Sequence, residues 1–171
     1  MGERILVAYA SRAGSTGEVA ETIGRVMCDK GLEVDVCLAK DVTDLSPYRA
    51  IVVGSAIYMG KWMRDAATFV EKRREVLSQI PIAYFTVCLT MKDDTEENRR
   101  TVTAYLDPVR EQAPEVQPMA VGLFAGRLDS RKLPFLYRMI AKAIGEAEAD
   151  YRDWEAIRTW AGELVPLLGG A

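Results

Sequence analysis

The sequence contains no histidine, and this absence excludes several kinds of active site. A Ser–His–Asp triad and a Cys–His pair both need an imidazole base, and histidine zinc sites are excluded for the same reason. Cysteine is scarce as well. Cys28, Cys37 and Cys88 form no C-x-x-C spacing, and their odd number does not indicate a disulfide framework. We therefore expect a reducing, cytoplasmic setting, with chemistry supplied by other side chains or by a bound cofactor.

Long apolar runs and a strong net charge are also missing. No segment approaches the ~18 apolar residues that span a bilayer, and the first residues lack the apolar stretch of a signal peptide. The formal net charge of −3 argues against general nucleic-acid binding. With 171 residues, 49% of them hydrophobic, and no repeat or linker, the sequence predicts a single domain over residues 1–171.

Two hydrophobic periodicities alternate along the chain. Short apolar runs predict five strands, and segments with apolar residues three and four apart predict helices between them. The predicted strands are residues 4–10, 32–38, 48–54, 81–90 and 116–125, and the predicted helices are 16–30, 64–77, 95–112, 134–144 and 151–168. This alternation favours a parallel sheet covered on both faces, with strand order 2-1-3-4-5 or that of a truncated Rossmann domain.

The loop after the first predicted strand has the composition of a phosphate-binding turn. It comprises Ser11, Arg12, Ala13, Gly14, Ser15 and Thr16. Small residues let successive backbone N–H groups point inward, and the start of the next helix adds partial positive charge. Hydroxyl groups can donate to phosphate oxygens there. The simpler alternative is an ordinary turn in which a serine or threonine caps the helix.

Other phosphate sites do not match this loop. A Walker A loop requires a lysine that is missing, and a dinucleotide fingerprint requires three glycines where only Gly14 and Gly17 are present. A low-molecular-weight tyrosine phosphatase would have a cysteine at the head of the loop. A receiver domain would have acidic residues where this chain has Ser11-Arg12 and Ser55-Ala56. The remaining interpretation is a phosphate monoester on a flavin.

Two further loops leave the third and fourth predicted strands. The first comprises Ser55, Ala56, Ile57, Tyr58, Met59 and Gly60, before Lys61 and Trp62, and the second comprises Val87, Cys88, Leu89, Thr90 and Met91. Tyr58, Met59 and Trp62 offer flat or soft apolar surface for a ring, and the second loop offers backbone groups for its polar edge. Either loop alone could be an ordinary turn. All three loops fall at one edge of the sheet, which favours FMN.

The same stretches resemble a known family. Residues 11–16 are similar to the T-x-T-G-x-T loop of flavodoxins, with Ala13 at one hydroxyl position. Over nearly the whole chain, the sequence resembles the menaquinone-dependent protoporphyrinogen IX dehydrogenases, a flavodoxin-like branch in haem biosynthesis. The matching stretches are residues 11–16, 54–60, 85–89, 125–128, 134–142 and 153–155. The resemblance implies a flavodoxin-like, doubly wound α/β fold with a five-stranded parallel sheet and bound FMN.

Residues 127–145 form a basic segment in an acidic chain. Its positive residues are Arg127, Arg131, Lys132, Arg138 and Lys142, and Asp129 opposes them. One apolar face would be formed by Leu133, Leu136, Tyr137, Ile140 and Ile144. Such a segment could rest on an anionic membrane, bind the carboxylates of a porphyrin, or be a core helix with a solvated face. In the resembled family this region is an insertion associated with substrate or membrane contact.

The resemblance implies an FMN-dependent oxidoreductase that dehydrogenates protoporphyrinogen IX and passes electrons to a quinone. The flavin would accept hydride, so no side chain need act as a catalytic acid or base. We expect a cytoplasmic protein or one held peripherally at the inner face of the cell membrane. Two alternatives remain at this point, namely a flavodoxin-type electron carrier without its own substrate and a binding module that has lost flavin.

Overall fold

The computed structural model describes residues 2–12, 14–129, 135–136, 139 and 148–169. Its centre is a sheet of five parallel strands, joined by one short antiparallel strand. The parallel strands are β1 (Arg4–Ala10), β2 (Val34–Leu38), β3 (Tyr48–Tyr58), β5 (Ile82–Cys88) and β6 (Val121–Ala125). They lie in the order β2-β1-β3-β5-β6. Counting only the parallel strands, this is the predicted order 2-1-3-4-5, and it excludes the Rossmann alternative.

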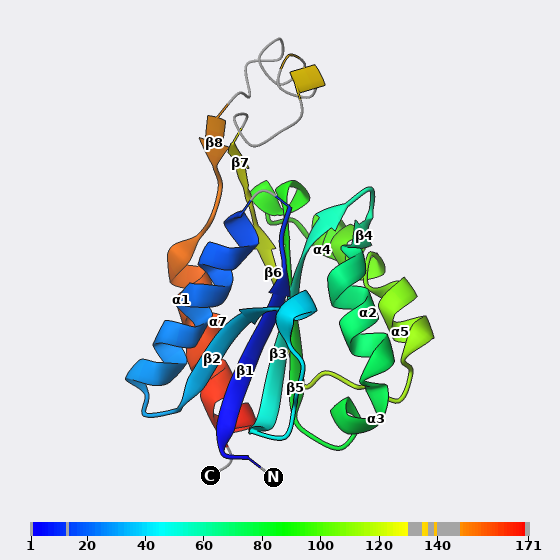
Figure 1. Cartoon of the computed structure of the whole chain (residues 1–171). Coiled ribbons are helices and arrows are strands. Elements are labelled where there is room, and N and C mark those ends of the chain that lie inside the picture. Colours follow the sequence, from blue (N-terminus) through cyan, green and yellow to red (C-terminus); the bar gives the residue numbers. More distant parts are fainter. Residues whose placement is uncertain (1, 13, 130–134, 137–138, 140–147, 170–171) are drawn as a thin grey trace.

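Helices cover both faces of this sheet (Figure 1). One face carries α1 (Ser15–Asp29) and α7 (Trp154–Leu168), and the other carries α2 (Arg64–Lys72), α3 (Arg74–Leu77), α4 (Glu96–Ala104) and α5 (Asp107–Gln112). The apolar stripe of α1 contains Val19, Ile23 and Met27, all fully buried. Every residue of β5 is buried, as expected for a central strand covered on both sides.

Several predicted element boundaries are wrong. The predicted helix 95–112 is two helices, α4 and α5, because Pro108 cannot donate a backbone hydrogen bond and occupies the first turn of α5. The predicted helix 64–77 is likewise divided at Arg73 into α2 and α3. The last strand of the sheet starts at Val121, beyond Pro118, rather than at residue 116. Of the predicted helix 134–144, only residues 135, 136 and 139 are described, and these are helical.

Two short strands that the periodicity did not predict follow β6. They are β7 (Arg127–Asp129) and β8 (Glu148–Asp150), which pair antiparallel with Arg127 opposite Asp150. They project from the carboxyl edge of the main sheet (Figure 1). The predicted basic segment therefore starts in a hairpin arm beside the loops that were expected to form the site. Within the described part of the chain, no helix is long and apolar enough to cross a membrane.

Candidate functional site

The first turn of α1 lies at the carboxyl end of β1 and has no side-chain cap. Gly14 occupies the N-cap position with φ of 88°, a left-handed conformation that glycine adopts without steric cost. The Gly14 N–H donates to Ser11 Oγ at 2.8 Å, which curls the loop back on itself. The backbone N–H groups of Ser15, Thr16 and Gly17 precede the first intrahelical hydrogen bond, from Glu18 N to Gly14 O. The capping alternative is therefore wrong for α1.

Thr16 supplies an independent indication that an oxygen-rich group belongs at this turn. Its side chain is fully buried, yet its Oγ1 has no hydrogen-bond partner. A buried hydroxyl without a partner is costly, and native structures rarely keep one. An anion at a helix N-terminus would meet amide donors and favourable dipole charge, and the threonine hydroxyl could donate as well. These residues fit a phosphate group. Ala13 lies outside the described residues.

A buried arginine that the sequence did not single out braces this turn. The Arg152 side chain is only 4% exposed, forms an ion pair with Glu18 in the first turn of α1, and donates to both oxygens of Asp150 at 2.9 and 2.7 Å. Its guanidinium also lies 4.5 Å from the centre of the Trp154 ring. The hydrogen bonds from Arg152 lower the pKa of Asp150. Arg152 thus ties α1 to β8 and to the start of α7, and its positive charge opposes the negative charge of Glu18 in the first turn of α1.

The loop predicted after the third strand is a β-hairpin, so its description as a loop is wrong. β3 continues through Tyr58 and pairs with β4 (Lys61–Trp62), with Ile57 opposite Trp62. The turn residues Met59 and Gly60 both have positive φ, 52° and 71°, as a type I′ hairpin requires. For methionine this conformation is strained by roughly 1–2 kcal/mol, and such strain gathers at functional sites.

Two side chains of the hairpin hold it to the sheet. Fully buried Ser55 accepts a hydrogen bond from the Met63 N–H at 2.9 Å and donates to the Ala56 carbonyl at 2.7 Å. Trp62 is 5% exposed and donates from Nε1 to Thr86 Oγ1 at 2.9 Å. Trp62 therefore belongs to the core, and its expected role as an open surface for a ring is wrong.

Three apolar side chains remain at the surface of the two ring loops. Tyr58 is 40% exposed, Met59 81% and Leu89 40%. Leu89 begins the short 3₁₀ helix η2 (Leu89–Lys92), which follows β5. Because β3 and β5 are paired neighbours, their ends place these side chains on adjacent loops of one edge. This is the kind of apolar surface on which a flat ring could rest.

Most of the β5 loop is covered. Val87, Cys88 and Met91 are buried, and Thr90 is half-buried. Burial raises the pKa of the Cys88 thiol, so the thiol stays protonated at neutral pH and is a poor nucleophile. The chemistry expected at this edge therefore does not come from Cys88.

The structure describes little of the predicted basic segment. Arg127 lies on β7 opposite Asp150, so its positive charge faces an acid across the hairpin. Arg131, Lys132, Arg138 and Lys142 lie outside the described residues. Phe135, Leu136 and Met139 are described, and they are 69%, 66% and 55% exposed. The predicted role of this segment in substrate or membrane contact stays a prediction.

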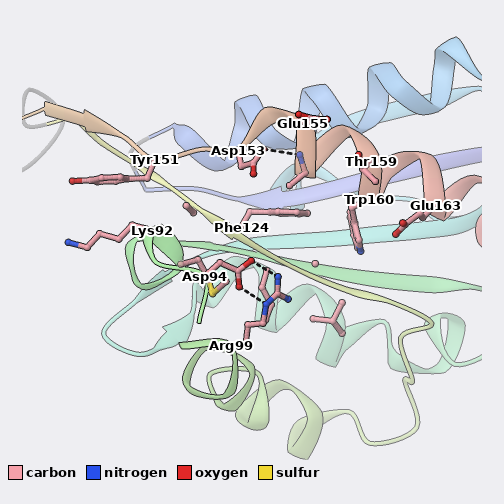
Figure 2. Close-up of a pocket in the computed structure, with 16 residues that line it drawn as sticks. Lys92, Asp94, Arg99, Phe124, Tyr151, Asp153, Glu155, Thr159, Trp160 and Glu163 are labelled. Carbon is pink, nitrogen blue, oxygen red and sulfur yellow. Dashed lines mark hydrogen bonds and ion pairs between the residues drawn. The ribbon is translucent and has the colours of Figure 1, made fainter. Parts of the chain in front are cut away.

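An open groove of about 630 Å³ runs beside the edge strand β6 and was not predicted (Figure 2). Trp160 and Glu163 of α7 form one wall, and the other includes Asp94 and Arg99. Arg99 donates two hydrogen bonds to Asp94, at 2.5 and 2.7 Å, which lower the pKa of Asp94. Among the lining residues, only Met91 and Lys92 come from the loops described above, so this groove is distinct from the predicted flavin site.

Comparisons with solved structures support the fold. The chain superposes on a cysteine-to-serine mutant of flavodoxin from Pseudomonas aeruginosa with a TM-score of 0.57 and 14% identity, covering 98% of this chain and 99% of the other. It is similar to oxidised flavodoxin 1 from Bacillus cereus, with a TM-score of 0.57 and 17% identity, covering 95% and 97% of the two chains. At these identities the likeness shows the fold alone.

Two curated relatives carry the same name. The chain is 28% identical to protoporphyrinogen IX dehydrogenase [quinone] from Leishmania major, over 96% of this chain and 75% of that protein. It is 23% identical to the protein of the same name from Escherichia coli K12, over 96% of each chain. These matches confirm the resemblance drawn from the sequence and support an FMN-type oxidoreductase.

One family match covers most of the chain. Residues 6–154 match the flavodoxin domain, from β1 through the first residue of α7. Flavodoxins are FMN proteins, so the match confirms the expected cofactor. The strand order and the uncapped first turn of α1 agree with it. This chain belongs to the flavodoxin domain family.

Proposed function

We propose that this chain is an FMN-dependent dehydrogenase that oxidises protoporphyrinogen IX and passes the electrons to a quinone. The substrate and acceptor follow from the names of its curated relatives, which match it along nearly its whole length. The cofactor site follows from three loops at the carboxyl edge of the sheet. We place the FMN phosphate at residues 11–16 and the flavin ring between residues 55–60 and 87–91.

The observation that carries this proposal is the combination of an uncapped α1 with the buried, unpartnered hydroxyl of Thr16. Backbone amides at the helix start would bind the phosphate oxygens, and Thr16 would gain the partner that it lacks. The brace between Arg152 and Glu18 reduces the repulsion that an acid in this turn would exert on a phosphate. Ser11 and Ser15 add hydroxyl donors on the same loop.

The ring loops would orient the flavin and exclude water from one side of it. Tyr58 and Met59 offer an aromatic ring and a polarisable thioether, and Leu89 offers an aliphatic surface. When bound, FMN supplies an acceptor for two electrons and a proton from the substrate, and it can return electrons to a quinone. No side chain of these loops is required as a general base, because the cofactor carries the hydride.

Anaerobic turnover tests the proposal. Purified protein loaded with FMN is mixed with protoporphyrinogen IX and a menaquinone analogue, and the appearance of porphyrin fluorescence is followed. We expect fluorescence to rise only when protein, FMN and quinone are all present. If FMN-loaded protein forms no porphyrin above the protein-free rate, the proposed substrate is wrong.

The alternative is an electron carrier without its own substrate, which is compatible with membership of the flavodoxin domain family. The two one-electron reduction potentials of bound FMN separate the alternatives. A carrier would have widely separated potentials with a very low second one. A two-electron dehydrogenase would have potentials close together.

We propose further that residues 127–145 contact either the anionic carboxylates of the substrate or an anionic membrane. The exposed apolar side chains of Phe135, Leu136 and Met139 support a contact surface in this segment. Co-sedimentation with phosphatidylglycerol vesicles, compared with phosphatidylcholine vesicles, distinguishes the two. Binding to the anionic vesicles alone would support the membrane, and binding to neither would favour the substrate.

A further inference from the structure

Arg12 and Tyr58 form a direct contact between the phosphate loop and the ring hairpin. The guanidinium carbon of Arg12 lies 4.0 Å from the centre of the Tyr58 ring, well within the range of a cation–π interaction. The energy of such a contact is modest at an exposed site. Its main effect is to fix the position of the ring relative to the cation. Tyr58 is 40% exposed and lies in a hairpin with two paired residue positions, so Arg12 covers part of a ring that is otherwise partly open to solvent.

The sheet explains why these two side chains meet. β1 and β3 are parallel neighbours, and their register aligns Ala10 with Ser55. Arg12 lies two residues beyond Ala10, and Tyr58 lies three residues beyond Ser55, so both leave the same edge on adjacent strands. The turn at Met59 and Gly60 reverses the chain immediately after Tyr58 and holds the ring near that edge. The strand register therefore brings residues 12 and 58 to the same edge of the sheet, where the two side chains meet.

The charge of the three loops has one sign. Within residues 11–16, 55–60 and 87–91, the one charged residue is Arg12, and Lys61 and Lys92 directly follow the second and third loops. Glu18, the first acid after the first loop, pairs with Arg152, whereas Asp93 directly follows Lys92 at the third loop. Arg12 therefore stands within the first loop without an adjacent acid in sequence, and a positive charge beside a bound group favours the more negatively charged redox state of that group. Flavin that has taken up two electrons carries a negative charge at neutral pH.

We propose that Arg12 is a positioning residue that fixes the Tyr58 ring at the flavin site and whose charge favours the fully reduced, anionic flavin. This inference rests on the proposed FMN function and adds to it a determinant of two-electron chemistry. The guanidinium group performs both tasks because it is planar, can stack on an aromatic face and stays charged. A carrier that must hold a single electron would gain nothing from such a cation.

Four variants separate charge from stacking. R12K keeps the charge but replaces the planar group with a compact ammonium ion, R12Q removes the charge, and Y58L removes the aromatic surface. K30Q is the matched control, because Lys30 directly follows the last residue of α1. For a helix of this length, it lies about 22 Å along the helix axis from the first turn of α1. Thermal unfolding of each apoprotein checks that the fold is intact.

The readouts are FMN affinity, the second reduction potential and the visible circular dichroism of bound FMN. We expect R12Q to disfavour the fully reduced flavin about tenfold, which is ~59 mV for a one-electron couple. We expect R12K and Y58L to leave the second reduction potential close to the wild-type value but to change the visible circular dichroism of bound FMN. We expect K30Q to change neither. Equal potentials for R12Q and K30Q would overturn the inference while leaving the FMN function standing. A wild-type chain that binds no FMN would overturn both.

Discussion

Replacement of Thr16 by valine is expected to affect the apoprotein and its FMN complex in opposite directions. Valine has nearly the shape of threonine but lacks the hydroxyl, which is fully buried and without a partner in the structure. A buried unsatisfied hydroxyl costs roughly 1–3 kcal/mol, so T16V should stabilise the apoprotein by about 1 kcal/mol. For a chain of this size that corresponds to an increase in Tm of about 2–4 °C.

The same substitution should weaken FMN binding. A hydrogen bond to a charged phosphate contributes about 1.5–3 kcal/mol, so its loss should raise the Kd of FMN by roughly tenfold to 150-fold. The quenching of FMN fluorescence gives the Kd, and a thermal melt without FMN gives the Tm. T22V is the control, because Thr22 lies on the same helix but donates to the Glu18 carbonyl at 3.0 Å. The reasoning is refuted if T16V binds FMN as tightly as wild type, or if it melts at a lower temperature without FMN.

Two further substitutions test the turn and its brace. G14V should abolish FMN retention because a β-branched residue is strained at φ of 88°, whereas G14N should keep the fold since asparagine tolerates this conformation; equal retention of FMN by G14V and wild type would contradict the cradle. R152M should cost about 1–2 kcal/mol of stability, discounted because Glu18 and Asp150 are half-exposed and can rehydrate. The pKa of Asp150 is lowered from 3.8, so its pairing stabilises the fold above pH 3.8 and is lost as the pH falls through the folded value. Urea denaturation should therefore show that the difference in free energy of unfolding between wild type and R152M decreases below about pH 3.8. A difference that is independent of pH would argue against the pairing.

The sheet and its site edge could be predicted because local patterns carry that information. The run from Arg4 to Ala10 has strand composition throughout, and β1 has the predicted bounds. The spacing of Val19, Ile23 and Met27 marks the buried stripe of α1. Alternation of such strands and helices fixes a parallel sheet, and a parallel sheet brings the loops after β1, β3 and β5 to one edge.

The misses have specific causes. The apolar spacing of Val102, Leu106 and Val109 continues across two helices because all three side chains are buried, although Pro108 interrupts the backbone. Val102 packs in a small cluster beside β5 and β6, whereas Leu106 and Val109 belong to the larger core. The hairpin at Met59 has no Asn-Gly or Asp-Gly signal, and methionine in a left-handed conformation is not a preference that a sequence displays. Here tertiary packing overrides local propensity.

Pairings between distant residues were beyond the reach of local patterns. β7 and β8 are joined by residues 130–147, and a strand of three residues has too little periodicity to be recognised. Arg152 lies 134 residues from its partner Glu18, so its burial among two acids and Trp154 follows only from the folded chain. The long-range ion pair that braces the candidate phosphate turn is therefore a property of the fold.

The account depends most on where the phosphate of FMN binds, and a crystal structure of the FMN complex would measure this directly. We predict that its oxygens accept hydrogen bonds from the amides of Ser15, Thr16 and Gly17 and from the Thr16 hydroxyl. A phosphate bound elsewhere on the chain, or a Thr16 hydroxyl still without a partner in the complex, would contradict the account.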